Sequence, residues 1–115
     1  MAHIINPVKV KESSDLYFAQ PITFESMRRA KGNASDVSIE LLSTQFDEDL
    51  EIIPSGFKVL ANLERSILDI NPRLQGRKLP LIKDVLLRAS ENTSAEYLIY
   101  TNADIGLMPH FYQYV

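Results

Sequence analysis

The chain of 115 residues has the length of one domain, and its 45% of apolar and 23% of charged residues are typical of a globular protein. A formal net charge of −3 gives no indication of a surface for nucleic acid or for an anionic membrane. The chain has no cysteine and two histidines, which excludes disulfides, thiolate chemistry, and a zinc site built on sulfur or on a histidine cluster.

The N-terminus has no basic segment followed by an apolar one, as a secretory signal would, and no apolar run approaches the length of a membrane span. We therefore expect a soluble, cytoplasmic protein with no membrane span. Repeats, low-complexity tracts and linkers are also absent from the sequence. A single domain over residues 1–115 follows.

The first two predicted elements are a strand and a helix. Segment 2–10 is short and β-branched, and it predicts a strand with Pro7 at its end or at a bulge, because proline cannot donate to a central ladder. Thr23 is the expected N-cap of a helix with an apolar stripe at helical spacing. Gly32 and Asn33 are expected to end this helix.

The middle of the chain predicts a second strand and a less regular region. Segment 37–44 alternates at first and then becomes apolar, which favours a strand, and an acidic loop follows at 45–49. Segments 57–60 and 66–70 are each compatible with strand or helix. For 66–70 we favour an extended piece, ended by Asn71 and Pro72.

The last third predicts a helix, a strand and the start of another helix. Segment 79–88 has apolar residues at helical spacing, with Pro80 placed in the first turn, where its missing N–H is not needed. Segment 97–101 predicts a strand, and Met108 and Pro109 open a further helix. The alternation of strands and helices predicts an α/β fold, a three-layer sandwich with a mostly parallel sheet.

Polar residues that follow the predicted strands are the candidates for a ligand site, because ligands of parallel sheets bind at the carboxyl ends of strands. These candidates are Asn6, segment 44–47 and segment 101–104. Asn102 and Asp104 follow strand 97–101 and lie two positions apart. A carboxylate beside an amide oxygen suits a hard cation such as Mg²⁺ or Mn²⁺, which shares oxygen ligands with phosphates. The alternative is that Asp104 caps the helix or turn that follows.

The closing motif resembles that of a known enzyme family. Segment 97–107, YLIYTNADIGL, is similar to the strand and DXD-type motif of nucleotide-sugar glycosyltransferases of the GT-A fold. Segment 78–86, KLPLIKDVL, resembles the helix that leads into that strand, and the order of elements matches over nearly the whole chain. The resemblance implies the N-terminal, nucleotide-binding half of this fold. It also implies a nucleotide-diphosphate sugar bound through a divalent metal at Asp104.

Two departures from the family pattern shape the expected function. The first acidic position of the motif is occupied by Asn102, and the sequence ends 11 residues after Asp104, before the half that carries the acceptor site and the catalytic base in such enzymes. We therefore expect a glycosyltransferase-like domain, truncated at its C-terminus and incomplete as an enzyme by itself. The alternative is a non-catalytic truncated relative that acts as a binding or oligomerisation module.

The resemblance also implies further nucleotide-binding residues. Asn6 would lie beside the nucleotide, together with Asn102, while Thr44, Gln45 and Asp47 would face the base or the ribose. The alternative for residues such as Thr44 and Asp47 is an ordinary turn in which the side chains bond their own backbone.

A basic pair and a set of scattered glycines complete the search for phosphate-binding groups. Arg77 and Lys78 precede a predicted helix, where they would meet phosphates or simply be solvated. Four glycines are too dispersed for a G-x-G-x-x-G loop or a P-loop. A nucleotidyltransferase would use the same phosphate chemistry, but no basic, glycine-rich loop supports it.

The aromatic C-terminal segment predicts self-association. Phe111, Tyr112 and Val115 lie on the apolar side of a helix that would cover a sheet of about three or four strands with an exposed edge. Exposed apolar area of this kind usually marks an interface. We expect a homo-oligomer or an exchange of terminal segments between copies.

Overall fold

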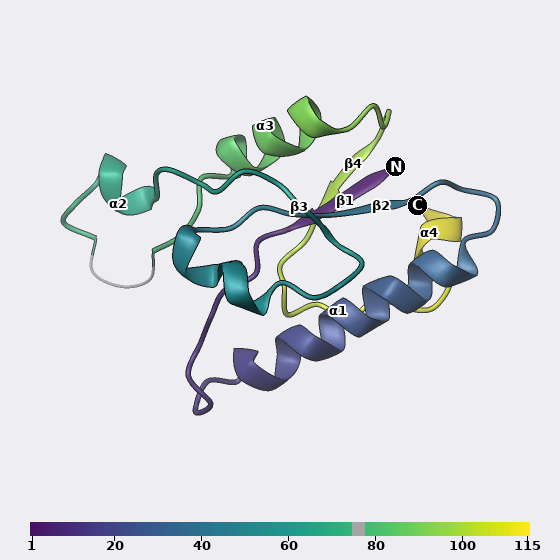
Figure 1. Ribbon diagram of the computed structural model, residues 1–115, viewed down its shortest axis with the longest axis horizontal. Helices are drawn as coiled ribbons and strands as arrows, with labels where there is room; N and C mark the ends of the chain where they lie inside the picture. The colour runs from purple at the N-terminus through teal and green to yellow at the C-terminus, as the bar shows by residue number, and fades with distance from the viewer. Residues whose placement is uncertain (75–77) are drawn as a thin grey trace.

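A parallel sheet of four strands forms the centre of the computed structural model, which describes residues 1–74 and 78–115 (Figure 1). The strands are β1 (Ala2–Ile5), β2 (Glu40–Ser43), β3 (Lys58–Val59) and β4 (Leu98–Tyr100), in the spatial order β3-β2-β1-β4. All three strand pairs are parallel. The predicted α/β sandwich with a parallel sheet is confirmed.

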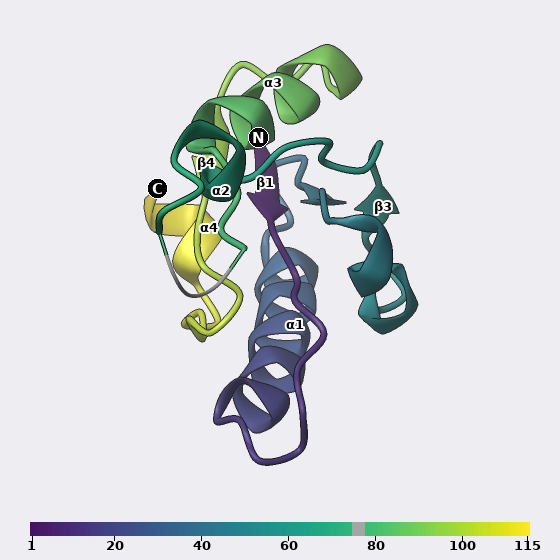
Figure 2. The same ribbon diagram turned by 90° about the vertical axis from the view of Figure 1, so that its left-hand side faces the viewer.

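Helices cover both faces of this sheet. They are α1 (Leu16–Asn33), the 3₁₀ helix η1 (Asp47–Ile52), α2 (Ile67–Ile70), α3 (Ile82–Asn92) and α4 (Phe111–Tyr114). The long helix α1 and the short α4 lie on one face, and α3 lies on the other (Figures 1 and 2). In the described part of the chain, no helix is both long and apolar enough to cross a membrane.

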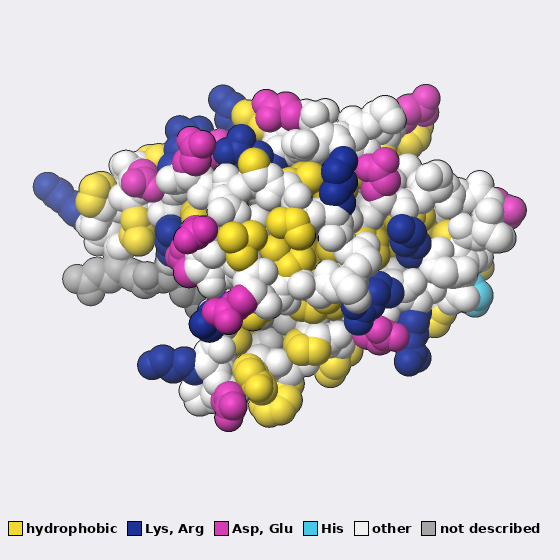
Figure 3. All heavy atoms as spheres, in the orientation of Figure 1, with side chains coloured by type: hydrophobic (Ala, Val, Ile, Leu, Met, Phe, Trp, Pro, Cys, Tyr) yellow, Lys and Arg dark blue, Asp and Glu magenta, His cyan; other side chains and the backbone are white. Residues whose placement is uncertain are grey.

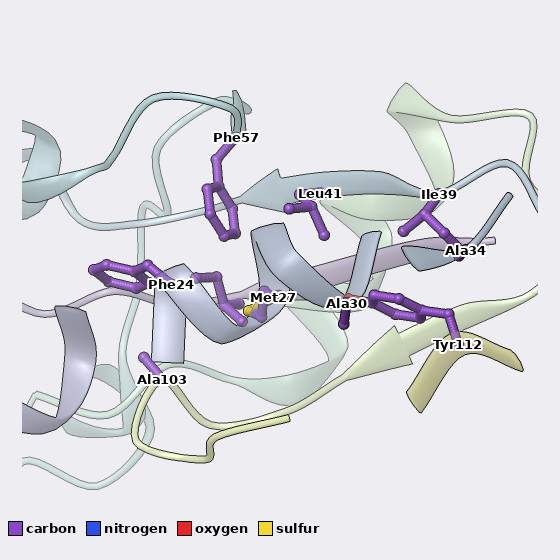
Figure 4. Packing of buried hydrophobic residues seen from close by; sticks show 10 residues of the cluster. Phe24, Met27, Ala30, Ala34, Ile39, Leu41, Phe57, Ala103 and Tyr112 are labelled. Carbon is purple, nitrogen blue, oxygen red and sulfur yellow. The ribbon is translucent and has the colours of Figure 1, made fainter. Parts of the chain in front are cut away.

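The period of two along the strands divides the buried side chains between two cores. Ile5 belongs to the core under α1, which contains Phe24, Met27 and Tyr112 and is drawn in Figure 4. Its neighbour Ile4 belongs to the core under α3, with Leu42, Val85 and Ala89 among its members. The central strand β1 therefore anchors both helical layers, and its end is held in a fixed place.

The N-terminus of α1 differs from the predicted one. The helix begins at Leu16 and includes Pro21, so the expected N-cap at Thr23 is wrong. Thr23 is buried within the helix, where its Oγ1 donates to the carbonyl of Ala19 at 3.1 Å. The buried face of α1 extends back to Gln20, and this tertiary packing outweighs the helix-breaking tendency of proline. The predicted end at Asn33 is confirmed.

Segment 66–70 also differs from the expectation of an extended piece. It forms the short helix α2, whose start carries a capping box. The Ser66 hydroxyl accepts from the Leu68 N–H at 3.3 Å, and the Asp69 carboxylate accepts from the Ser66 N–H at 2.6 Å. These reciprocal bonds satisfy backbone donors that an extended segment would need to pair elsewhere. Ser66 and Pro80 form an isolated antiparallel bridge, so Pro80 precedes α3 and is not in its first turn.

Candidate functional site

The order of the strands creates a crevice beside β1. Strand β1 lies between β2 and β4. The segments that follow β2 and β4 therefore leave the sheet on either side of the end of β1. Such a point is where parallel sheets bind ligands. Asn6 directly follows β1, while Asn102 and Asp104 follow β4 shortly after its end. Three of the predicted site residues thus come to the same place.

Two adjoining hollows form what we call the carboxyl-edge cleft. The larger, of about 490 Å³, is bounded by Phe46, Glu48, Asp49 and Lys78 at its β2 end. The smaller, of about 190 Å³, is bounded by Tyr100, Asn102 and Asp104 at its β4 end. Both hollows share a lining of five residues: Asn6, Val8, Leu16, Leu79 and Pro80. The shared lining makes the two hollows one elongated cleft across the end of β1.

Four predicted site residues line this cleft. Asn6 is buried, and its Nδ2 donates to the carbonyl of Thr44 at 2.9 Å, which ties the segment after β1 to the end of β2. Lys78 places its Nζ 3.0 Å from a carboxylate oxygen of Glu48 and 4.1 Å from the centroid of the Phe46 ring. Asn102 and Asp104 are exposed at the opposite end. The β2 end of the cleft carries the Phe46 ring, the Lys78–Glu48 ion pair and Asp49, and the β4 end carries an amide and a carboxylate.

Thr44 and Gln45 lie beneath the edge of the sheet, outside the lining of the cleft. Both are fully buried and paired with the segment that follows β3. The Thr44 hydroxyl donates to the Ala61 carbonyl at 3.1 Å, and Gln45 Nε2 donates to the Leu60 carbonyl at 3.0 Å and to Asn62 Oδ1 at 2.7 Å. These bonds hold the chain after β3 against β2, so the two residues shape the edge of the sheet from below.

The other predicted residues have different surroundings. Asp47 is exposed at the start of η1, and its Oδ1 accepts from Asn62 Nδ2 at 3.4 Å. Arg77 lies outside the described residues. The N-cap position of α4 is His110, six residues beyond Asp104, so Asp104 does not cap that helix.

Several residues of the cleft were not predicted from the sequence. They come from the strap, our name for residues 7–14 between β1 and α1, and from η1. Glu48 lies in η1, and hydrogen bonds from its own backbone N–H and from the Lys78 ammonium hold the pKa of its carboxyl below the usual range. Burial raises the pKa of the neighbouring Asp49. The strap directly follows a central strand, and this position in the sequence was the signal that could have identified its residues as part of a ligand site.

The β4 end offers one carboxylate and one amide as oxygen groups. Among residues 1–74 and 78–115, no three histidine, aspartate or glutamate side chains are grouped as a metal site. Asp104 therefore offers one carboxylate, with the Asn102 amide nearby. Mg²⁺ is commonly held by one or two carboxylates together with substrate phosphates and waters, and this set of residues fits that pattern.

Comparison of the chain with protein-family models, with curated proteins and with solved structures found no match. The evidence for a function is therefore the closing motif and the carboxyl-edge cleft.

Proposed function

We propose that this domain binds a nucleotide-diphosphate sugar in the carboxyl-edge cleft, with Mg²⁺ or Mn²⁺ held at Asp104, as part of glycosyl transfer. The observation that supports the proposal is the continuity of the cleft from the aromatic β2 end, past Asn6, to the carboxylate at the β4 end. An elongated ligand with an apolar, hydrogen-bonding head and an anionic tail matches this gradient. A nucleoside diphosphate is such a ligand.

The chemistry of the two ends favours one orientation of the nucleotide. The Phe46 ring lies at the β2 end, the Asn6 side chain lies in the lining that both hollows share, and the Glu48 carboxylate at the β2 end is an acceptor for ribose hydroxyls. The base and ribose therefore belong at this end. Asn102 and Asp104 supply oxygen ligands at the β4 end, where a metal would also bind diphosphate oxygens.

In this orientation the residues of the β4 end would bind the metal and the diphosphate. Asp104 and Asn102 would hold the metal and align the diphosphate at the mouth of the cleft. When bound, the metal supplies positive charge that stabilises the diphosphate as it leaves the sugar. The cleft residues keep the nucleoside fixed while the sugar passes to an acceptor hydroxyl. With an amide at the first position of the motif, we expect the metal to bind together with the diphosphate.

The direct test is a calorimetric titration of UDP and of GDP into the protein, with and without Mn²⁺. Replacing Asp104 with alanine should weaken the Mn²⁺-dependent binding at least about tenfold, as expected for the loss of a charged metal ligand. Asp36→Ala is the matched control, because this exposed aspartate precedes β2 at the opposite edge of the sheet. Lack of nucleotide binding by the unchanged protein, or full binding by Asp104→Ala, would contradict the proposal.

The second candidate, a binding or oligomerisation module, is favoured by the exposed strand β4. Within the described residues β4 pairs on one side alone, with β1, and the adjacent Tyr97 side chain is 68% exposed. An open strand edge beside an aromatic side chain is suited to pairing with a second copy. We propose that the chain forms a homo-oligomer through this edge.

Sedimentation at micromolar concentration tests the oligomer. We expect a species larger than the 13.1 kDa monomer, and Tyr97→Lys should return it to the monomer because charge on an edge strand opposes pairing. Tyr17→Lys is the control, since Tyr17 is also exposed but lies on α1. A monomer in the unchanged protein would overturn this candidate without affecting the nucleotide proposal.

A further inference from the structure

We infer that Gln20 and Asp49 are positioning residues that hold the strap as a fixed wall of the carboxyl-edge cleft, so that its nucleoside end is formed before the ligand arrives. Neither residue was singled out by the sequence. The inference rests on the proposed function for the identity of the ligand, while the wall itself is a property of the protein alone.

Gln20 binds both backbone groups of one strap residue. Its Oε1 accepts from the Val8 N–H at 2.8 Å, and its Nε2 donates to the Val8 carbonyl at 2.6 Å. The side chain is 4% exposed and belongs to α1. Val8 lies beyond the end of β1, so the glutamine amide supplies the pairing that a neighbouring strand would give.

Asp49 holds the next residue from the opposite side. Its Oδ1 accepts from the Lys9 N–H at 2.8 Å, and the carboxylate is almost fully buried in η1. The Lys9 ammonium also pairs with Glu51, which is at the end of the same 3₁₀ helix. Two consecutive strap residues are thus fixed by two elements: α1, whose buried face packs in the core under the sheet, and η1.

The strap has open space on both of its sides. Val8, Lys9 and Val10 line the larger hollow of the cleft, and the same three residues line a groove of about 610 Å³ that is bordered by α1 residues such as Tyr17 and Phe18. Pro7 begins the strap and is fully buried, but Val8, Lys9 and Val10 face a hollow on each side. The position of these three residues therefore depends mainly on the hydrogen bonds of Gln20 and Asp49.

The consequence for binding is a difference between the two ends of the cleft. Lys9, Val10 and Asp49 line the larger, β2-end hollow and not the β4-end one, whereas Val8 lines both hollows and Gln20 lines the β4-end hollow with Asp104. A loose strap would have to be ordered when a nucleoside binds, and that ordering lowers affinity. When the strap is loosened at Lys9 by removing the Asp49 carboxylate, binding of a ligand that occupies the β4 end alone should be unaffected. General destabilisation of the protein would not produce this difference.

The experiment compares Asp49→Ala with the unchanged protein, because Asp49 holds Lys9 and does not line the β4-end hollow. For the variant we expect the affinity for UDP with Mn²⁺ to fall about tenfold, while that for inorganic pyrophosphate with Mn²⁺ changes less than about twofold. Asp36→Ala is the matched control, since Asp36 is exposed and precedes β2, away from the strap. An equal fall for both ligands, or no fall for UDP, would overturn the positioning role.

Hydrogen exchange tests the wall without any ligand. In Gln20→Met the Val8 and Lys9 amides should exchange faster, while the Ile4 and Ile5 amides keep their protection. Unchanged exchange at Val8 would overturn the inference. If Gln20→Met fails to fold, Asp49→Ala removes the acceptor of the Lys9 N–H, and the Lys9 amide should then exchange faster. Absence of UDP binding by the unchanged protein would overturn the proposed function. The exchange result alone would then show whether Gln20 holds the strap in place.

Discussion

Acidification from about pH 7 to about pH 4.5 should lower the free energy of unfolding by about 2 kcal/mol through His3. This histidine is fully buried in β1, where its Nδ1 lies 2.7 Å from the Tyr112 hydroxyl and its Nε2 lies 2.8 Å from the Thr101 hydroxyl. Burial lowers the pKa of His3 from 6.5 to about 4. In this pH window the unfolded chain therefore binds a proton that the folded protein excludes. The stability is complete above the unfolded pKa and is lost as the pH falls towards the folded pKa.

Urea unfolding across this pH range measures the effect. His3→Gln keeps groups that can pair with both hydroxyls and removes the titration, so its stability should vary less with pH than that of the unchanged protein. His110→Gln is the control, because it replaces the other histidine, which is exposed at the start of α4. An equal pH dependence in His3→Gln and the unchanged protein would show that His3 is not the responsible group.

Carboxylates also titrate at the acid end of this range, with effects of both signs. Burial raises the pKa of Asp49, which favours the folded state as the pH falls. Hydrogen bonds from Arg65 lower the pKa of Asp84, which has the opposite effect. Both groups are present in His3→Gln and in the unchanged protein. The difference between the two proteins therefore isolates the contribution of the buried imidazole.

The general fold was predictable because its signals are local and repeated. Strand-like and helix-like patterns alternate along the chain, and a parallel sheet with helices on its faces is the arrangement that buries both. Individual boundaries depended on tertiary contacts. The start of α1 at Leu16 and the capping box at Ser66 involve residues whose burial the local pattern does not reveal.

The candidate site was predictable only where polar side chains come directly after a predicted strand. Asn6, Asn102 and Asp104 were found by that rule, and all three line the carboxyl-edge cleft. The same rule selected Thr44 and Gln45, whose side chains instead pair with the chain after β3, 15 to 17 residues away. Pairing at this distance leaves no periodic trace in the sequence.

Gln20 and Asp49 were missed for a related reason. Each acts on the backbone of a segment far from it along the chain, with sequence separations of 12 residues for Gln20 and Val8 and 40 for Asp49 and Lys9. Their partners are an N–H and a carbonyl that every residue type carries, so no particular side chain marks the contact. Only the path of the strap between α1 and η1 identifies them.

Replacing Pro21 with alanine should raise the free energy of unfolding by about 2 kcal/mol. Pro21 lies inside α1 and has no N–H to donate to the carbonyl one turn earlier, that of Tyr17. A proline in a helix interior costs about 3 kcal/mol relative to alanine, and about 1 kcal/mol of this is offset because proline restricts the unfolded chain. The position is exposed, so the substitution disturbs no core packing.

Urea unfolding of Pro21→Ala, beside Pro72→Ala, tests this expectation. Pro72 is exposed in a turn outside the helices, so its replacement should only free the unfolded chain and slightly lower stability. If the free energy of unfolding rises in Pro21→Ala and falls in Pro72→Ala, the first turns of α1 form against the helix-breaking preference of Pro21. A neutral or destabilising Pro21→Ala would mean that the proline ring, which borders the groove beside the strap, contributes packing that compensates for the missing hydrogen bond. In that case the start of α1 and the position of the strap would be determined together.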